Sequence, residues 1–345
     1  VNESNIIMEL AKAVRGNINA MYVFSSIYDI DCQNVKFTNA IEMVSDDFYF
    51  KKKPSKEFIF TPIPNLHFNS SVLKDVYINI LNSKVTISNT IRSDYLPTQI
   101  QIGNTYYTLG FGGLHSNNST TVAYGNLMLL DVGSYYPSLV CFNETLQNII
   151  NNSEFINYFH HIYEERMKAK EQNNNSLSHA LKLVINAITG KFNQKYSKFY
   201  NPCVYLQMTI TGQLLLLKLI EMLSENGIET ITANTDGIIV NDPLNKYSII
   251  TKEWERIFNL KLSKKKLKFL YMENINNYFS ISDDNIMKGC GCFNFELNKN
   301  KSNNGMVVYL ALREYFLNDK QPSQYIETSV DKNLFIDIAN VGDNT

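Results

Sequence analysis

Cysteine is scarce in this sequence, and its distribution excludes a disulfide framework. The chain of 345 residues holds five cysteines, and only Cys290 and Cys292 lie close together. A disulfide scaffold needs an even set at regular spacing, and a structural zinc site needs four ligands in a compact pattern. We therefore expect reduced thiols in a cytoplasmic protein.

Long apolar runs are missing as well. No stretch of about 20 apolar residues occurs, and the densest run, Leu214 to Ile220, is interrupted by Lys218. The N-terminus lacks the charged and then apolar pattern of a signal peptide. Because 44% of the residues are hydrophobic, the composition predicts a soluble globular chain of about two domains with no membrane segment.

Net charge is nearly absent, at -1, but the charges are unevenly distributed. No Asp or Glu occurs from Gln172 through Ile220. The basic residues form two groups, Lys182, Lys191, Lys195, Lys198 and Lys218, and then Lys261, Lys264, Lys265, Lys266 and Lys268. This segregation is typical of a protein that binds a polyanion and also keeps acidic metal ligands. A solvated lysine face is the alternative for the second group.

Two carboxylates follow apolar runs that we interpret as buried strands. Asp131 lies in the segment LLDVGSYYPS at residues 129–138, and Asp236 lies in TANTDGIIV at residues 232–240. A lone buried carboxylate is expensive unless a cation, hydrogen bonds or a metal compensates its charge. The two segments therefore predict a shared metal site.

Three motifs resemble those of family B DNA polymerases. The first segment resembles the D-x-x-S-L-Y-P-S pattern, and the second resembles Y-x-D-T-D-S in the variant N-T-D-G. Between them, KLVINAITG at residues 182–190 resembles K-x-x-x-N-S-x-Y-G. The order is that of the family, with 51 residues from Asp131 to Lys182 and 54 more to Asp236. The resemblance covers about residues 100–315.

The resemblance implies an α+β fold: a polymerase palm with an antiparallel β-sheet, short two-helix fingers and a partial helical thumb. Helical spacing over residues 151–172 and 177–188 predicts the fingers as an antiparallel hairpin. The expected regions are 1–95, an N-terminal remnant preceding the palm; 96–150, palm; 151–190, fingers; 191–290, palm; and 291–345, the start of an incomplete thumb. Because the chain starts at Val1, we expect a fragment or processed chain.

The resemblance also assigns catalytic and nucleotide-binding residues. Asp131 and Asp236 would be catalytic and would bind two Mg²⁺ ions, with Mn²⁺ as an alternative. Asn234 stands where the family has another acid. Backbone amides from Val132 to Tyr135 are expected to be free before a helix opened by Pro137. The predicted nucleotide-binding set is Val132, Gly133, Ser134, Tyr135, Tyr136, Arg166, Lys170, Lys182 and Asn186, with Tyr136 beneath the sugar.

A second set of residues is expected to contact DNA. The glycine-rich turn at Gly112 and Gly113 would approach the template, although a plain hairpin turn explains it equally well. Gly190 closes the middle motif. Tyr278 would hold the primer terminus, with Lys288 replacing a lysine that the family has nearby. The implied partners are primer-template DNA and deoxynucleoside triphosphates, and accessory replication proteins are not identifiable.

The function predicted from these motifs is template-directed extension of a primer 3′ end in a bacterial or viral replication setting, with phage-like or plasmid-like motif variants. Two alternatives stay open. One is a catalytically weak polymerase fragment that binds primer-template DNA. The other is a metal-dependent glycosyltransferase that uses Asn234-Thr-Asp236 as a D-x-D-like element.

Overall fold

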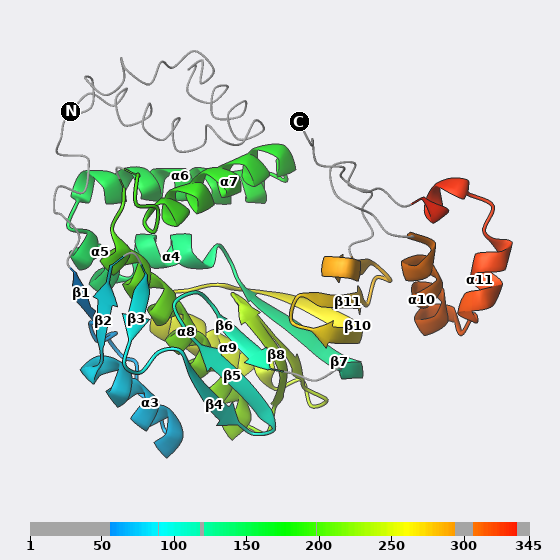
Figure 1. Cartoon of the computed structure of the whole chain (residues 1–345), viewed down its shortest axis with the longest axis horizontal. Coiled ribbons are helices and arrows are strands. Elements are labelled where there is room, and N and C mark those ends of the chain that lie inside the picture. Colours follow the sequence, from blue (N-terminus) through cyan, green and yellow to red (C-terminus); the bar gives the residue numbers. More distant parts are fainter. Residues whose placement is uncertain (1–55, 89, 118–120, 198, 294–305, 337–345) are drawn as a thin grey trace, which may run out of the picture. The chain divides into compact units, whose positions relative to one another are not determined.

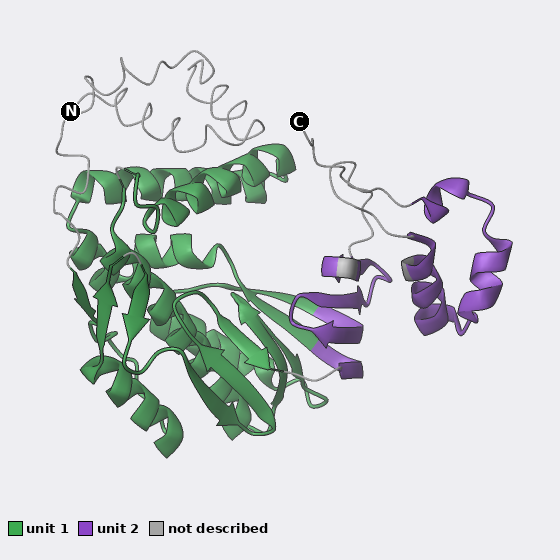
Figure 2. Ribbon diagram, in the orientation of Figure 1, with its two compact units in different colours: residues 1–117, 128–265 green, residues 118–127, 266–345 purple. Residues whose placement is uncertain are grey.

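A computed structural model describes residues 56–336, apart from residues 89, 118–120, 198 and 294–305 (Figure 1). The chain divides into two compact units, with residues 1–117 and 128–265 in unit 1 and residues 118–127 and 266–345 in unit 2 (Figure 2). Residues 1–55, and with them most of the predicted N-terminal region, lie outside the described residues. The fold is α+β with antiparallel sheets, as predicted.

Unit 1 is built on a sheet with the strand order β7-β9-β8-β6-β5-β4. The strands are β4 (Thr98–Ile102), β5 (Thr105–Leu109), β6 (Leu114–Asn117), β7 (Thr121–Val132), β8 (Glu229–Thr235) and β9 (Gly237–Asn241). Strands β4 to β6 form a meander, and β8 and β9 form a hairpin. Buried positions alternate with more exposed ones along β5, so one face of this strand packs on the core.

Helix α8 (Pro202–Glu225) forms the centre of the unit 1 core. Asn201 caps it by accepting a hydrogen bond from the backbone of Val204, and Pro202 occupies its first turn. Helix α9 (Tyr247–Phe258) packs against it, with the Trp254 indole donating to the Leu215 carbonyl at 2.9 Å. Helix α8 is long and apolar enough to cross a membrane, but 89% of its apolar window is buried inside the protein, as in a core helix.

Four helices connect β7 to α8. They are α4 (Tyr135–Phe142), α5 (Glu144–Ile150), α6 (Ser153–Glu171) and α7 (Asn175–Lys191). Helices α6 and α7 lie side by side (Figure 1). Asn152 and Asn174 cap their N-termini through their side chains. The structure confirms the predicted helical hairpin, and its identity as the fingers stays a prediction.

A small three-stranded sheet precedes these elements. It contains β1 (Glu57–Ile59), β2 (Lys84–Ile87) and β3 (Ile91–Ser93), and helix α3 (Ser71–Asn82) connects β1 to β2. Both strand pairs are antiparallel.

Unit 2 has its own aromatic core. Strands β10 (Leu262–Asn274), β11 (Asn277–Ser282) and β12 (Met287–Cys290) pair in antiparallel fashion. The 3-10 helices η2 (Gly291–Phe293) and η3 (Lys332–Phe335) flank the helices α10 (Met306–Asn318) and α11 (Pro322–Thr328). The rings of Tyr271, Phe279, Phe293 and Phe316 pack together. The predicted helical character of the last region is confirmed, whereas its role as a thumb is untested.

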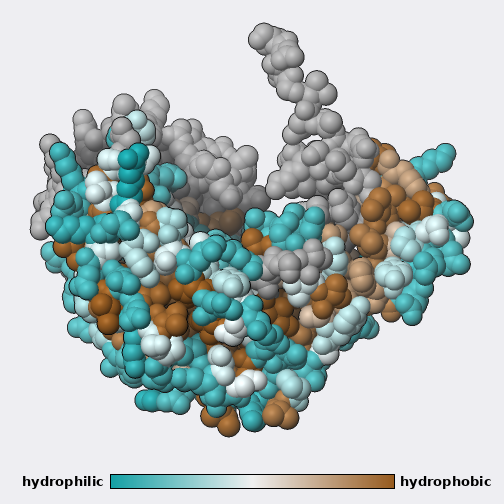
Figure 3. Space-filling model, turned by 60° about the horizontal axis from the view of Figure 1, so that its bottom comes forward, coloured by the Kyte–Doolittle hydropathy of each residue, from teal (hydrophilic) through white to brown (hydrophobic). Residues whose placement is uncertain are grey.

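Hydrophobic side chains on the surface are scattered among polar ones. Figure 3 shows hydrophilic residues over much of one face, with hydrophobic residues between them. The exposed hydrophobics in unit 1 include Leu244 and Ile249. Single exposed apolar residues are normal on folded proteins, so this pattern alone assigns no binding surface.

A buried ion pair within α8 also connects this helix to the residues just before α3. Glu221, with 3% of its surface exposed, accepts hydrogen bonds from the backbone amides of Asn69 and Ser70, each at 2.8 Å. Its other oxygen lies 2.7 Å from the ammonium of Lys218. Lys218 interrupts the apolar run of α8 because it neutralises this carboxylate inside the core.

Removing the Glu221 carboxylate should destabilise the fold strongly. We expect Glu221→Ala to lower the free energy of unfolding by about 3–5 kcal/mol, because Lys218 would stay buried without a partner. Glu225→Ala removes an exposed carboxylate from the same helix, where it contacts only the Asn69 side chain, and should cost less than about 1 kcal/mol. Urea denaturation measures both, and equal losses would contradict the role of the buried pair.

Candidate functional site

The two predicted catalytic aspartates lie at neighbouring strand ends in unit 1. Asp131 is the penultimate residue of β7, and Asp236 occupies the turn between β8 and β9. The Val132 amide donates to the Asp236 carbonyl at 2.8 Å. Asp131 also faces the hairpin closely, because a Cβ added at Gly237 would lie 3.1 Å from its Oδ1. The turn between β8 and β9 therefore places Asp236 beside the end of the strand that carries Asp131.

Both aspartates line a pocket of about 640 Å³. The pocket brings together every predicted site residue except Tyr278 and Lys288: Gly112, Gly113, Asp131, Val132, Gly133, Ser134, Tyr135, Tyr136, Arg166, Lys170, Lys182, Asn186, Gly190 and Asp236. They come from sequence positions more than 100 residues apart. The local sequence motifs alone do not require these residues to line one pocket. Each residue's chemical role is still a prediction.

Tyr278 and Lys288 belong to unit 2. Tyr278 lies on β11 opposite Cys290, and Lys288 lies on β12 opposite Ser280. Neither residue lines the pocket. Their proposed contacts with a primer therefore stay predictions.

The turn that carries Asp236 is conformationally strained. Thr235 has φ of +55°, a left-handed conformation that is rare for a β-branched residue. The Asp236 amide folds back onto the Asn234 carbonyl at 2.6 Å. The Thr235 hydroxyl donates to Asn234 Oδ1 at 3.3 Å and lies 3.3 Å from His115 Nε2. Neighbouring side chains therefore hold the unusual backbone of this turn.

The glycine-rich turn packs directly against Thr235. A Cβ at Gly113 would lie 2.6 Å from Thr235 Oγ1 and 2.9 Å from its Cα, which no real side chain tolerates. A Cβ at Gly112, by contrast, would meet no atom within 4 Å. The close approach to Thr235 therefore requires glycine at position 113.

Helix α8 fixes the other side of the same glycine turn. The Gln213 side chain accepts from the Gly110 amide and donates to the Gly110 carbonyl, both at 2.9 Å. It also donates to the Gly112 carbonyl at 3.3 Å. Gln213 is buried, so these bonds hold the turn rigidly against α8.

Two tyrosines at the start of α4 are stacked against α8. The rings of Tyr135 and Tyr136 have centroids 5.8 Å apart and an interplanar angle of 13°. A Cβ at Gly212 would lie 3.3 Å from both rings, and the Tyr135 hydroxyl donates to the Gly212 carbonyl at 2.6 Å. Burial, with the Asp236 charge among the smaller causes, raises the pKa of both phenols. Both therefore present neutral hydroxyls.

The prediction that the backbone amides from Val132 to Tyr135 are free is wrong for Val132 and Gly133. The Val132 amide is bound to Asp236, and the Gly133 amide donates to the Lys261 carbonyl at 2.9 Å. Helix α4 also begins at Tyr135, before Pro137. The amides without an intrahelical partner are therefore those of its first turn, at Tyr135 and Tyr136. Both hydrogen bonds join segments that are far apart in the sequence, so the local motif does not predict them.

Basic residues of the helical hairpin line the pocket. Arg166 and Lys170 come from α6, and Lys182 comes from α7 with Asn186. Desolvation and the positive charges of Arg166 and Lys182 lower the pKa of Lys170, while Asp131 acts in the opposite direction. The three cations are thus close enough to repel one another, and an anionic ligand would relieve that repulsion.

Arg166 is the most unusual of these cations. Its side chain is buried, with 4% of the residue exposed. Its Nε and Nη1 atoms have no hydrogen-bond partner among the described residues. Burial accordingly lowers the pKa of its guanidinium. Buried donors on a charged group normally have partners, so this guanidinium is an exceptional feature of the pocket lining.

The sequence interpretation missed the contribution of α8 to the pocket. Tyr205 and Thr209 line it from this helix, four residues apart. That spacing inside an apolar helix is a polar signal that could have identified them. Ser263 on β10 also lines the pocket, and its hydroxyl donates to the Asp131 carbonyl at 3.2 Å.

Some lysines of the second basic group interact with other side chains of the protein. Lys264 lies 3.7 Å from Glu255, and Lys266 lies 3.2 Å from Asp283. Lys268 contacts the Asn285 side chain. These interactions support the alternative of a solvated, internally paired face for part of the group.

The oxygen donors in the pocket suit a hard divalent cation. Asp131 and Asp236 supply carboxylates, and Mg²⁺ is commonly held by one or two carboxylates together with substrate phosphates. Within the described part of the chain, no group of three or more His, Cys, Asp or Glu side chains forms a closed metal site. The residues therefore fit an ion shared with a phosphate ligand better than a structural ion.

Comparisons with known proteins point to polymerases. No protein-family model matches the chain. Its sequence is 28% identical over 130 residues to DNA polymerase 1 of Saccharolobus solfataricus, covering 34% of this chain and 15% of that protein. It also matches the structure of the family B DNA polymerase from Pyrobaculum calidifontis, with 15% identity, a TM-score of 0.40, and coverage of 62% of this chain and 33% of the other. The chain is thus distantly similar to DNA polymerases and spans a minor part of their length.

Crowding at Gly113 predicts a sharp contrast with its neighbour. Gly113→Ala should lower the free energy of unfolding by about 1–3 kcal/mol, because the new methyl group must displace Thr235. Gly112→Ala should change it by no more than about 0.5 kcal/mol. Thermal or urea unfolding compares the two variants. Equal effects would mean that the approach of β6 to Thr235 is looser than the structure shows.

Proposed function

We propose that this chain is the catalytic part of a template-directed DNA polymerase that adds deoxynucleotides to a primer 3′ end. One observation carries the proposal: a single pocket is lined by the carboxylates of Asp131 and Asp236 and by the cations of Arg166, Lys170 and Lys182. Two nitrogen atoms of the buried Arg166 guanidinium have no hydrogen-bond partner among the described residues. This arrangement suits a ligand that has a metal-bound phosphate chain. The distant sequence similarity to a DNA polymerase supports the same class.

Phosphoryl transfer requires positioning and charge neutralisation more than covalent help from the protein. Asp131 and Asp236 would hold two Mg²⁺ ions, or Mn²⁺ in their place, and these ions would neutralise charge on the reacting phosphate. Arg166, Lys170 and Lys182 would bind the triphosphate. First-turn amides of α4 would add neutral donors.

The remaining pocket residues would select the nucleotide. Tyr136 is braced by its stacking on Tyr135 and by the hydrogen bond from its hydroxyl to the Gly112 carbonyl at 3.5 Å. Such a fixed ring would lie beneath the sugar and exclude a ribose 2′-hydroxyl. Asn186 and Gly190 would lie near the new base pair.

Four further residues would contact DNA. Gly112 and Gly113 would approach the template, and Tyr278 and Lys288 would hold the primer. We assign the chain to a cytoplasmic replication setting in a bacterium or virus. Its phage-like or plasmid-like source and the proposed palm, fingers and thumb boundaries belong to the same proposal.

Primer extension tests the proposal directly. Asp131→Asn and Asp236→Asn should each reduce Mg²⁺-dependent extension by about 100-fold or more, because each removes charge from the metal site. Primer-template affinity should change little. Asp75→Asn, an exposed substitution on α3, is the matched control and should extend normally. Normal turnover in either site variant would refute the metal assignment, and DNA binding without extension by the unaltered chain would favour the weak-fragment alternative.

Arg166 should show opposite effects on stability and nucleotide use. Arg166→Met should raise the free energy of unfolding by about 1–2 kcal/mol, because it removes unsatisfied buried donors. The same variant should raise the apparent KM for deoxynucleotides by about 10- to 100-fold, because a charge-assisted contact is lost.

Lys168→Met provides the control for Arg166→Met. Lys168 lies on the same helix but is exposed and paired with Glu165 at 2.9 Å. Its replacement should leave both quantities nearly unchanged. If Arg166→Met instead weakened duplex binding without changing nucleotide dependence, Arg166 would belong to the DNA-tracking surface.

A further inference from the structure

The loop between α7 and α8, at residues 192–201, carries a tyrosine whose side chain lies in solvent. Tyr196 is 97% exposed, the highest value among the large hydrophobic residues that the structure describes. A tyrosine commonly covers its ring with protein and leaves only the hydroxyl tip in water. Because exposure alone assigns no function, the surroundings of this ring decide its interpretation.

The Tyr196 loop is closed on itself and anchored in the core of unit 1. The Asn201 amide donates to the Phe192 carbonyl at 2.9 Å, so the two ends of the loop meet. Phe192 and Phe199 are buried, and both rings pack against Phe155 of α6. Compact surface loops of this kind are frequently functional. The Tyr196 ring therefore stands on a backbone that is fixed on both sides, which reduces the ordering cost of binding a ligand.

The sequence around Tyr196 is basic. Lys195 is exposed beside it, and Lys191 ends helix α7. No Asp or Glu occurs from Gln172 through Ile220, so neither the loop nor the adjoining parts of α7 and α8 supply an acidic side chain. This part of the chain therefore favours a polyanionic ligand.

The Tyr196 loop joins two segments that line the candidate site. Gly190 near the end of α7 and Tyr205 on α8 both line the pocket around Asp131. Tyr196 follows Gly190 by six residues, and a chain of that length spans at most about 20 Å. A strand that leaves the pocket past this wall can therefore reach the loop.

An exposed aromatic ring beside lysines suits an unpaired nucleotide. Proteins bind single strands by stacking bases on aromatic side chains while basic residues follow the phosphates. A duplex keeps its base faces inside the stack and offers only its phosphates and sugars to such a ring. The combination of ring and charge therefore favours a single strand over a duplex.

We propose that Tyr196 stacks on an unpaired base of single-stranded DNA and that Lys195 binds an adjacent phosphate. The inference rests on the proposed polymerase function and deepens it, because the stacked base then belongs to the unpaired part of the template. The loop would hold the template where it passes the wall of the pocket.

A fluorescent substitution tests the stacking directly. The only tryptophan of the chain, Trp254, is fully buried, so Tyr196→Trp introduces an exposed reporter. We expect a short oligothymidylate to quench the new emission saturably, whereas the unaltered chain should respond little. Affinity for a blunt duplex of equal length should be weaker by about fivefold or more. Absence of quenching by the oligothymidylate, or equal affinity for the duplex, would overturn the proposal.

Variants of the loop connect binding to its residues. Tyr196→Ala should weaken oligothymidylate binding by about 5- to 150-fold, because the stacking surface is lost, and Tyr196→Phe should bind normally because it keeps the ring. Tyr106→Ala is the control, since Tyr106 is a half-exposed tyrosine on β5, and it should leave the affinity unchanged. Normal binding by Tyr196→Ala, or equal losses in the Ala and Phe variants, would contradict stacking.

The salt dependence of binding tests the role of Lys195. Lys195→Gln should lower the slope of log affinity against log salt concentration by about 0.7, because one phosphate contact with a single strand is lost. Tyr196→Phe should keep the slope of the unaltered chain. An unchanged slope in Lys195→Gln would overturn the assignment of this lysine.

Primer-template DNA separates this inference from the proposed function. Tyr196→Ala should weaken binding of a primer-template with a 5′ template overhang and should leave binding of a blunt duplex unchanged. If the unaltered chain extends primers but both DNAs bind the variant normally, the inference fails and the polymerase function stands. If the overhang effect is present but the unaltered chain extends no primer, the single-strand site stands and the polymerase function fails.

Discussion

The hydrogen bond from the Val132 amide to the Asp236 carbonyl fixes the site on which the rest of the proposed chemistry depends. Two carboxylates placed at neighbouring strand ends repel each other, so their side chains cannot hold the arrangement together. Backbone pairing does so, because its energy is independent of the side-chain charges. The protein can therefore present two acidic groups to one pocket before any cation arrives.

Strain and unsatisfied groups are concentrated around this pocket. Thr235 adopts a left-handed conformation, and two nitrogen atoms of the buried Arg166 side chain have no hydrogen-bond partner within the described part of the chain. Both features lower stability, and both aim polar groups at the same space. The surrounding core offsets this loss of stability. Helix α8 contributes most, because its apolar residues are almost completely buried. A site prepared for a charged ligand is thus supported by an element that contributes little charge itself.

The sequence allowed prediction of the parts that local chemistry determines. Asp131 and Asp236 follow apolar strands, and the cations of α6 and α7 repeat at helical spacing, so their elements and shared pocket were predictable. The bound amide of Gly133 was not, because its acceptor is the carbonyl of Lys261, which is far away in the sequence. For the same reason, the motif gave no sign that Gly113 meets Thr235. Long-range backbone contacts leave no periodic pattern in the sequence.

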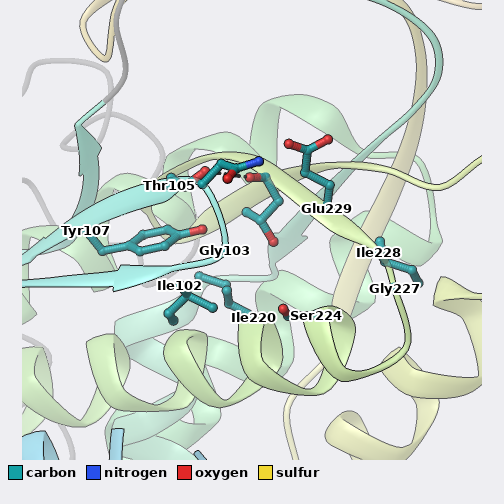
Figure 4. Close-up of a pocket in the computed structure, with 11 residues that line it drawn as sticks. Ile102, Gly103, Thr105, Tyr107, Ile220, Ser224, Gly227, Ile228 and Glu229 are labelled. Carbon is teal, nitrogen blue, oxygen red and sulfur yellow. Dashed lines mark hydrogen bonds between the residues drawn. The ribbon is translucent and has the colours of Figure 1, made fainter. Parts of the chain in front are cut away.

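The apolar sequence of helix α8 gives little indication of the contacts that this helix makes with the candidate site. Its apolar run indicates only a place in the core, yet Gln213 holds the glycine turn, Gly212 contacts two aromatic rings, and Thr209 lines the pocket. Toward the end of this helix, Ile220 and Ser224 line a separate cavity of unit 1 (Figure 4). Because close packing transmits small displacements, a change of side-chain volume at Gly212 would move Tyr135 and Tyr136 together. The geometry of the candidate site is therefore set as much by this buried helix as by the motifs that face the pocket.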